Sequence, residues 1–275
     1  MGAKFSTTAY RYPNEYPILA LTIVVVLFVI AFTVTATVCL SAIFVPLVVI
    51  WGYFSGLSNH RALVSRAQMV TSENSEELFS LIEENSARLQ VEEINVFILP
   101  SQNLNAYTFG LHSPKAVVLY SSLFQIMDRD EIQFILGHEM GHVRLGHTWL
   151  NTLVGGIAGI PSSLGAAAIM ELAFRWWNRA CEYSADRAGV LACGKPIKAV
   201  SALIKLETGV SSLNQDGLQA VIQHLESDDE DILHNLEETL ASHPMVAKRI
   251  DEIRHFASTR AYREMQSRMD QNLSG

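Results

Sequence analysis

The sequence predicts a mainly helical α+β protein with a small sheet and with transmembrane helices near its N-terminus. Residues 17–54 contain no charged side chain, and a run of that length exceeds one membrane span of about 20 residues. Two short runs rich in β-branched residues, 94–99 and 116–120, are typical of strands. Apolar residues recur at helical spacings of three and four elsewhere, most clearly over 131–143.

Composition narrows the classes of function. The chain has 275 residues, is 49% hydrophobic and carries a net charge of −8. This length allows one sizeable core plus a membrane element. The acidic balance argues against a nucleic-acid partner. The three cysteines are too few for a disulfide framework, which favours a reducing compartment for the soluble part.

The N-terminal region divides into a polar head, 1–16, and a transmembrane segment, 17–56. The apolar run is long enough for a tight hairpin of two spans that turns near Thr35–Thr37, and a single long helix kinked at Pro46 is the alternative. A hairpin places both flanks on one side of the bilayer. Because both flanks are basic, that side is expected to be the cytosol. The basic residues are Lys4, Arg11, Arg61 and Arg66.

A linker helix is expected over 57–74, followed by a catalytic domain over 75–260. The domain opens with a helix over 75–89 and continues with the two strands. Between the strands, Asn105, Ala106 and Tyr107 begin a short extended piece. An exposed edge strand there can hold a peptide by backbone pairing, although an ordinary edge strand has the same composition.

The sequence His138-Glu139-Met140-Gly141-His142 carries the chemistry. Residues four apart on a helix share a face, so His138 and His142 can grip one zinc ion. Glu139 lies beside the metal and is the candidate general base, taking a proton from a water whose pKa zinc lowers toward about 7. A third histidine six residues after His142 would complete one known pattern. That position is Thr148, and His147 misses it by one.

A second helix supplies the alternative third ligand. Glu182 and Asp186 lie one helical turn apart, so Glu182 can reach the zinc while Asp186 hydrogen-bonds the outer nitrogen of a zinc-bound histidine. We expect Arg179 to lie with Asp186 on the side of the ligands that faces away from the metal. A salt-bridged helix face is the other interpretation of these charges. Together with the first motif, however, the pattern favours one catalytic zinc ion in a gluzincin-type domain.

The apolar stretch 149–177 joins the two metal-binding helices. Ligands at both ends must meet at one ion, so the stretch must cross a membrane an even number of times. Glycines and Pro161 interrupt its middle and leave two arms of about a dozen residues, which is short of a full span. We predict a helical hairpin at or near the membrane surface, with a buried soluble hairpin as the alternative.

The C-terminal part offers one further candidate. Pro244 at a helix start leaves His243 extended and orientable, so His243 is proposed as a donor to the developing oxyanion, and a surface histidine is the alternative. Arg249 follows on the same helix and is a candidate for binding substrate or orienting His243. Residues 261–275 are expected to form a polar tail, as a solvated helix that frays.

These motifs resemble those of the membrane-bound gluzincin metallopeptidases that include HtpX-like proteins and CAAX prenyl proteases. The resemblance covers Ser75 to Ile250. It rests on Asn105-Ala106-Tyr107 with Gly110, on His138 to His142 with His147, on Arg179 to Asp186, and on His243-Pro244 with Arg249-Ile250. It implies that His138, His142 and Glu182 are the ligands, that Glu139 is the base, and that an edge strand binds substrate.

The resulting expectation is a membrane-anchored zinc endopeptidase that acts on membrane or misfolded proteins. Its partners would be protein or peptide substrates and the lipid bilayer. The location would be the bacterial cell membrane, with the catalytic domain facing the cytoplasm. The chain has too few spans for the large chamber of the prenyl proteases, so protein quality control is preferred, and narrowly specific processing is the alternative. A non-catalytic scaffold stabilised by zinc is the other.

Overall fold

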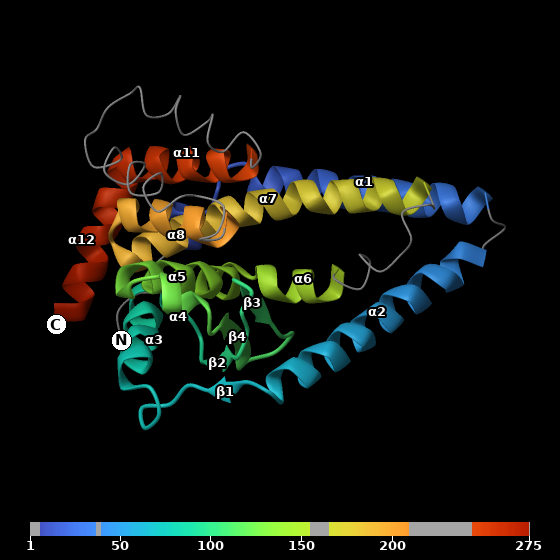
Figure 1. The fold of residues 1–275 in the computed structure, drawn as a ribbon. Coiled ribbons are helices and arrows are strands. Elements are labelled where there is room, and N and C mark those ends of the chain that lie inside the picture. Colours follow the sequence, from blue (N-terminus) through green and yellow to red (C-terminus); the bar gives the residue numbers. More distant parts are fainter. Residues whose placement is uncertain (1–5, 37–39, 155–164, 209–243, 275) are drawn as a thin grey trace.

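A computed structural model describes residues 6–36, 40–154, 165–208 and 244–274. A compact body carries the sheet and most helices, and the long helices α1, α2 and α7 extend from it (Figure 1). The elements are η1 Thr7–Ala9, α1 Glu15–Ala36, α2 Leu40–Val64, β1 Gln68–Met69, α3 Glu76–Leu89, β2 Ile94–Leu99, β3 Ala106–Phe109, β4 Lys115–Tyr120, α4 Leu123–Ile126, α5 Arg129–Leu145, α6 His147–Val154, α7 Gly165–Cys193, α8 Pro196–Thr208, α11 Pro244–Ser258 and α12 Arg260–Ser274.

The small mixed sheet has the strand order β1-β2-β4-β3. β2 and β4 are parallel, while β3 pairs with β4 in the antiparallel sense, with Tyr107 opposite Val118. The predicted strands over 94–99 and 116–120 are confirmed, and β4 begins one residue earlier than predicted. β1 is only two residues long and was not predicted, since so short a segment has no readable periodicity. β3 is an edge strand, as predicted for the short extended piece that begins at Asn105.

Helix α5 runs through the centre of the body. It packs against α3, α7 and α8 and contacts strands β3 and β4 (Figure 1). Its start is set by a capping box, in which the Asp128 side chain accepts from the backbone N–H of Glu131 and the Glu131 side chain accepts from that of Asp128. Its end is set by Gly146, whose positive φ of 83° suits glycine. The helix is therefore both buried and fixed at its two ends.

Helices α5 and α7 approach each other closely because small residues face each other. A Cβ atom added to Gly137 would lie 2.3 Å from the Cβ of Ala192, and one added to Gly141 would lie 2.6 Å from the Cβ of Ala188. Side chains at these glycines would therefore force the helices apart. Since α5 carries the two motif histidines and α7 carries Glu182, this contact sets the spacing of the candidate ligands.

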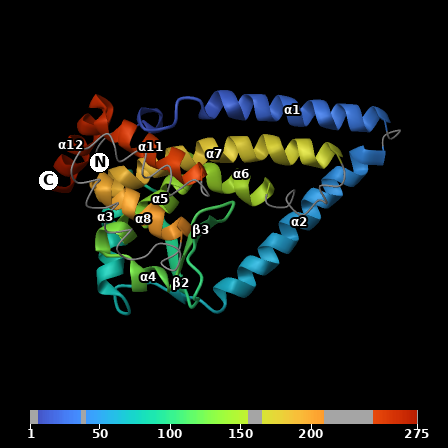
Figure 2. The same cartoon turned by 45° about the horizontal axis from the view of Figure 1, so that its top comes forward.

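The projecting helices form an apolar arm. α1 and α7 lie side by side, and α2 returns obliquely from the far end of α1 to the sheet (Figures 1 and 2). Within the described residues, one helix segment, Glu15–Thr33, is long and apolar enough to cross a membrane, with a mean hydropathy of 2.6. Exposed large apolar side chains lie along α1 and α2. They include Leu21, Val24, Leu27, Phe28, Phe32, Leu47, Ile50, Trp51 and Phe54.

The apolar stretch 149–177 is divided between two helices. α6 ends at Val154, whereas α7 continues without interruption from Gly165 through Glu182 to Cys193. At about 1.5 Å per residue, the 29 residues of α7 reach roughly 43 Å. One helix thus connects the apolar arm directly to the candidate site. The predicted break between the two arms lies at 155–164, outside the described residues.

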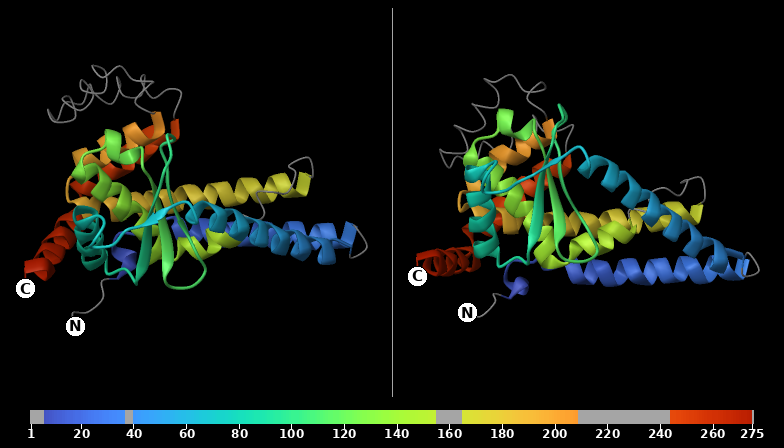
Figure 3. Two further views of the ribbon diagram at one scale, coloured as in Figure 1. Left: turned by 60° about the horizontal axis from the view of Figure 1, so that its bottom comes forward. Right: turned by 90° about the horizontal axis from the view of Figure 1, so that it is seen from below.

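Three segments differ from the sequence-based expectations. The expected linker helix is partly the end of α2, which runs to Val64, and β1 follows it. The tail is helical, as expected, but the expectation that it is solvated is wrong, because α12 buries Tyr262, Met265 and Met269 in the main core beside α3 (Figure 3). These residues recur at spacings of three and four, so one face of an otherwise polar helix is apolar. The polar head also packs onto the body, as described below.

Candidate active site

The two motif histidines and Glu182 converge at one point between α5 and α7. The Nε2 atoms of His138 and His142 lie 3.2 Å apart. The Glu182 carboxylate lies 3.4 Å from His138 Nε2 and 3.5 Å from His142 Nε2, through its two different oxygens. Two ligand atoms held about 2.0–2.1 Å from a tetrahedral ion lie roughly 3.4 Å apart. The three side chains therefore fit a single metal ion. Among the described residues, they form one of the groups whose ligand atoms lie close enough together to hold a metal.

Negative charge at this point favours a cation. Burial lowers the pKa of His138, but the carboxylates of Asp186 and Glu182 outweigh burial and raise this pKa to about 10. Burial also opposes ionisation of Glu182, yet Arg249 and the two histidines hold the pKa of this carboxyl well below its usual range. The negative charge that holds a proton on His138 would equally attract a divalent cation, and that cation would replace the proton on Nε2 when it binds the carboxylate and the two imidazoles.

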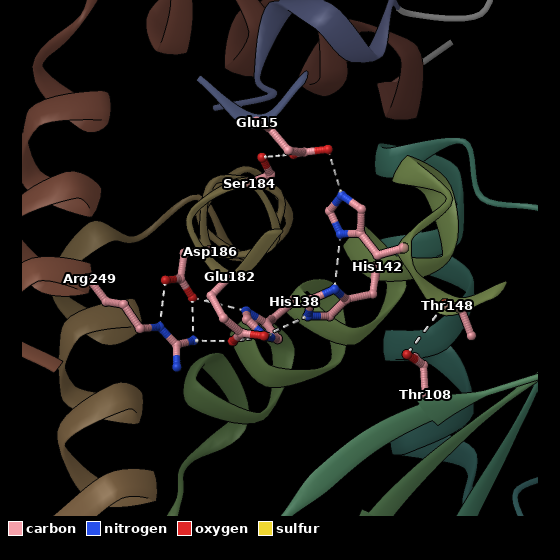
Figure 4. Close-up of polar contacts among 10 residues, drawn as sticks. Glu15, Thr108, His138, His142, Thr148, Glu182, Ser184, Asp186 and Arg249 are labelled. Atoms are coloured by element: carbon pink, nitrogen blue, oxygen red, sulfur yellow. Dashed lines mark hydrogen bonds and ion pairs between the residues drawn. The ribbon is translucent and has the colours of Figure 1, made fainter. Parts of the chain in front are cut away.

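Asp186 and Arg249 hold His138 from behind. Asp186 is fully buried, and its Oδ1 lies 2.9 Å from His138 Nδ1. The Arg249 guanidinium donates to both oxygens of Asp186, at 2.8 and 2.7 Å (Figure 4). Burial raises the pKa of Asp186, but Arg249 and His138 more than offset it and leave the pKa below its usual value. Because Nδ1 faces a carboxylate, Nε2 is left free to face the ligand cluster.

Glu139 lies in the same cleft without belonging to the ligand cluster. Its side chain is buried, and burial raises its pKa while the neighbouring histidines partly oppose that rise. A raised pKa brings a carboxylate closer to the pH at which it can both accept and return a proton. The position and environment of Glu139 therefore suit proton transfer.

The cleft is bordered by the edge strand. It has a volume of about 270 Å³. Beside the metal cluster and Glu139, its lining includes the start of β3, part of α8 and Arg249 of α11. The lining residues from these elements, with Asn105 just before β3, are Asn105, Ala106, Tyr107, Thr108, Leu203, Leu206 and Arg249. The predicted substrate strand and the predicted metal residues thus share one cleft.

Hydrogen bonds tie the edge strand to the helix that follows the metal helix. The hydroxyls of Thr108 and Thr148 lie 3.4 Å apart (Figure 4). The Gly110 amide donates to the hydroxyl of Thr152 at 3.5 Å. These contacts place β3 alongside α6, close to the C-terminal end of α5, so the strand is held in position relative to the motif histidines.

Two predicted residues are placed differently and one lies outside the described residues. Arg179 is exposed on α7, and the cation on Asp186 is Arg249, so the expectation that Arg179 lies behind the ligands is wrong. Arg249 is 5% exposed and binds Asp186 and Glu182, although it also lines the cleft. His243 lies outside the described residues. Arg179 and Asp186 are seven residues apart on α7, beyond the spacing of three or four at which helical side chains meet, whereas Arg249 reaches Asp186 from a different helix.

Sequence reasoning missed the residues behind His142. The Nδ1 atoms of His142 and His147 lie 3.0 Å apart, and His147 Nε2 lies 3.0 Å from Oε1 of Glu15. The hydroxyl of Ser184 donates to the other oxygen of Glu15. Glu15 is 132 residues from His147. No local spacing signals such a contact, and the nearby His147 was considered only as a possible ligand.

Comparison with known proteins adds independent information on the family. Residues 72–257 match the model of Peptidase family M48. The chain is 27% identical over 220 residues to "Plastoglobule-localized metallopeptidase 48, chloroplastic" of Arabidopsis thaliana, which covers 74% of this chain and 64% of that protein. It is 25% identical over 225 residues to the "Protease HtpX homolog" of Pyrococcus furiosus, covering 70% and 77%.

A bacterial relative extends the same similarity. The "Protease HtpX homolog" of Pseudarthrobacter chlorophenolicus is 26% identical over 191 residues, covering 58% of this chain and 64% of the relative. The chain therefore spans slightly less than two thirds of the length of the plant and Pseudarthrobacter proteins. The family match includes the motif histidines, Glu182 and Arg249. The predicted relationship to HtpX-like metallopeptidases is confirmed, and the chain belongs to Peptidase family M48.

Proposed function

We propose that this protein is a membrane-anchored, zinc-dependent endopeptidase that hydrolyses peptide bonds in membrane or misfolded proteins. The observation that carries the proposal is the convergence of His138, His142 and Glu182 at 3.2–3.5 Å in a cleft that also contains Glu139. Three protein ligands leave a position open for water or substrate, whereas structural zinc sites close with four. Among the described residues, the cluster that could hold a metal here has three members, which favours catalysis over a scaffold role.

The proposed chemistry divides between the metal and the protein. Zinc, when bound by His138, His142 and Glu182, would polarise the scissile carbonyl and lower the pKa of a water molecule toward neutrality. A Glu139 carboxylate oxygen would take the proton of the attacking water and return it to the leaving amide nitrogen. The raised pKa of Glu139 supports this role, because the carboxyl must hold the proton between the two transfers. Asp186 and Arg249 would keep His138 oriented.

The edge strand β3 supports a peptide as substrate. Asn105, Ala106 and Tyr107 line the cleft, and β3 is paired on one side with β4. An extended peptide can add to such an edge through backbone hydrogen bonds, which read no particular sequence. Binding of this kind suits a protease that acts on unfolded segments rather than on one processing site.

Membrane anchoring is supported by the apolar arm. The segment Glu15–Thr33 has the length of a membrane span, and only 11% of its window is buried in the body. An exposed apolar surface of this extent on α1 and α2 is otherwise costly in water. We assign α1 and α2 to a hairpin in a cell membrane. The basic flanks near Arg11 and Arg61 support a cytoplasmic location for the catalytic domain.

The test uses the full chain, purified in detergent and assayed for zinc content and for casein cleavage. Glu139→Gln should retain zinc but lower turnover by on the order of 10²-fold or more, since it removes the general base. Glu182→Ala should lose both zinc and activity, because it removes a ligand. Turnover of Glu139→Gln equal to that of the wild type would overturn the mechanism. Release of the protein from membranes by alkaline carbonate would overturn the anchoring.

A further inference from the structure

The residues that lead into helix α1, together with the first residue of that helix, pack against the metal-binding helices. Tyr10, Arg11 and Glu15 are 2%, 9% and 1% exposed. The Arg11 guanidinium donates to the backbone carbonyl of Leu145 at 2.9 Å, near the end of α5. The Tyr12 backbone N–H donates to the hydroxyl of Ser184 on α7 at 2.8 Å. A segment outside the family match at 72–257 is therefore attached to both helices that carry the ligands.

A continuous chain of hydrogen bonds links this segment to a candidate metal ligand. It runs from His142 Nδ1 to His147 Nδ1 at 3.0 Å, and from His147 Nε2 to Glu15 Oε1 at 3.0 Å. Asp186 and Arg249 approach the two histidines from one side, and Glu15 with Ser184 approaches from another (Figure 4). Each of the two imidazoles thus has its own support on its outer nitrogen. Support for His138 comes from within the family domain, and support for His142 comes from the N-terminal segment.

The positions of the protons along this chain follow from the ligand geometry. His142 Nε2 faces the cluster and must be unprotonated to bind a metal, so the proton of the neutral ring is on Nδ1. His142 Nδ1 then donates to His147 Nδ1, which leaves the His147 proton on Nε2. His147 Nε2 donates in turn to the Glu15 carboxylate. Every donor in the chain meets an acceptor, and one carboxylate at its end determines all the orientations.

The contacts of Glu15 show that its carboxylate is held in place. Arg11 forms a buried ion pair with Glu15, four residues further along the chain, and Ser184 donates to the second oxygen of Glu15. Glu15, His147 and Cys181 also lie close enough together to be considered as a second metal cluster. The guanidinium of Arg11, 3.4 Å from His147 Nε2, puts a positive charge there and disfavours a second cation. An orienting role fits these contacts better.

We propose that Glu15 is a positioning residue which, through His147, orients His142 for metal binding, so that the segment at the root of the first membrane helix is part of the metal centre. This inference rests on the proposed function, since it requires that His142 bind a metal. Residues that hydrogen-bond a ligating histidine typically change metal affinity by about 10–100-fold when they are substituted. Loss of the Glu15 carboxylate should therefore be measurable in zinc affinity without any assay of activity.

The experiment measures zinc affinity of the full chain in detergent by competition with a chromophoric chelator. Glu15→Gln keeps the shape of the side chain, and we expect its zinc affinity to fall by about 10–100-fold. His147→Ala should cause a loss of similar size. In the His147→Ala background, Glu15→Gln should have no further effect, because the path to His142 is already broken. The visible spectrum of the Co²⁺-loaded protein should change in Glu15→Gln, since it reports the geometry of the ligands.

A matched control separates positioning from general destabilisation. Glu131 is also buried and also accepts hydrogen bonds, from Ser201 and Lys205, but it does not contact the cluster. Glu131→Gln should lower the thermal midpoint and leave zinc affinity unchanged. Equal zinc affinity in Glu15→Gln and the wild type would overturn the inference, as would additive losses in the double variant. Absence of zinc binding by the wild type would instead overturn the proposed function.

Discussion

The close contact between α5 and α7 leads to a sharp prediction for Gly137→Ala. The added methyl group would lie 2.3 Å from the Cβ of Ala192, whereas carbon atoms in contact lie about 3.5–4.0 Å apart. The two helices must therefore separate locally by on the order of 1 Å. Alanine favours the helix by roughly 1 kcal/mol over glycine, but overpacking costs about 1–3 kcal/mol. We expect a net loss of up to about 2 kcal/mol in the free energy of unfolding.

The same displacement should affect the site, because the ligands come from both helices. His138 lies on α5 and Glu182 on α7, and their ligand atoms are 3.4 Å apart. A displacement of about 1 Å at a reacting centre can lower activity by roughly 10²-fold. Gly137→Ala should therefore reduce zinc affinity and casein cleavage more than its stability loss alone implies.

The assay combines chemical denaturation, zinc competition and casein cleavage for Gly137→Ala, Ala192→Gly and the double variant. Removing the Ala192 methyl group makes room for the new one, so the double variant should regain much of the zinc affinity. The recovery should be incomplete, because the Cα of Gly189 would still lie 3.2 Å from the added Cβ. A Gly137→Ala protein that is more stable than the wild type and fully active would refute the reasoning.

Four further predictions concern separate parts of the structure. Arg249→Met leaves the buried Asp186 carboxylate without its cation and should cost about 3–5 kcal/mol in denaturant titrations; a cost below about 1 kcal/mol would show that water replaces the guanidinium. Asp128→Ala removes the N-cap of α5 and should lower stability by about 1 kcal/mol, with activity retained. Met269→Ala should lower the free energy of unfolding by about 2–5 kcal/mol, because this residue is 1% exposed. An unchanged free energy of unfolding would instead support a solvated tail. His243→Ala should lower kcat by on the order of 10²-fold at constant zinc content if His243 is an oxyanion donor, while a change in KM alone would make it a substrate-binding residue.

Short-range patterns in the sequence predicted several elements and pairings well. Helix α3 lies within the helix predicted over 75–89, and the bounds of β2 match the predicted strand. Glu182 and Asp186 lie on one face of α7, and Asp186 contacts His138 through the nitrogen that the pattern indicated. These features depend on helix or strand periodicity within a few residues, which the sequence displays directly.

The sequence by itself therefore determined the family, the zinc motif and the presence of an apolar N-terminal region. Only the tertiary structure decided that Arg249 rather than Arg179 binds Asp186, that α12 is buried, and that Glu15 supports His142 through His147. Arg249 and Asp186 are 63 residues apart, and Glu15 and His147 are 132 apart. No local periodicity links such residues. They meet because α11 and α1 both pack against α7, which brings Arg249 and Glu15 to the two sides of the ligand cluster. Buried polar groups in proteins form hydrogen bonds, and these groups form them with the partners that this packing places nearby.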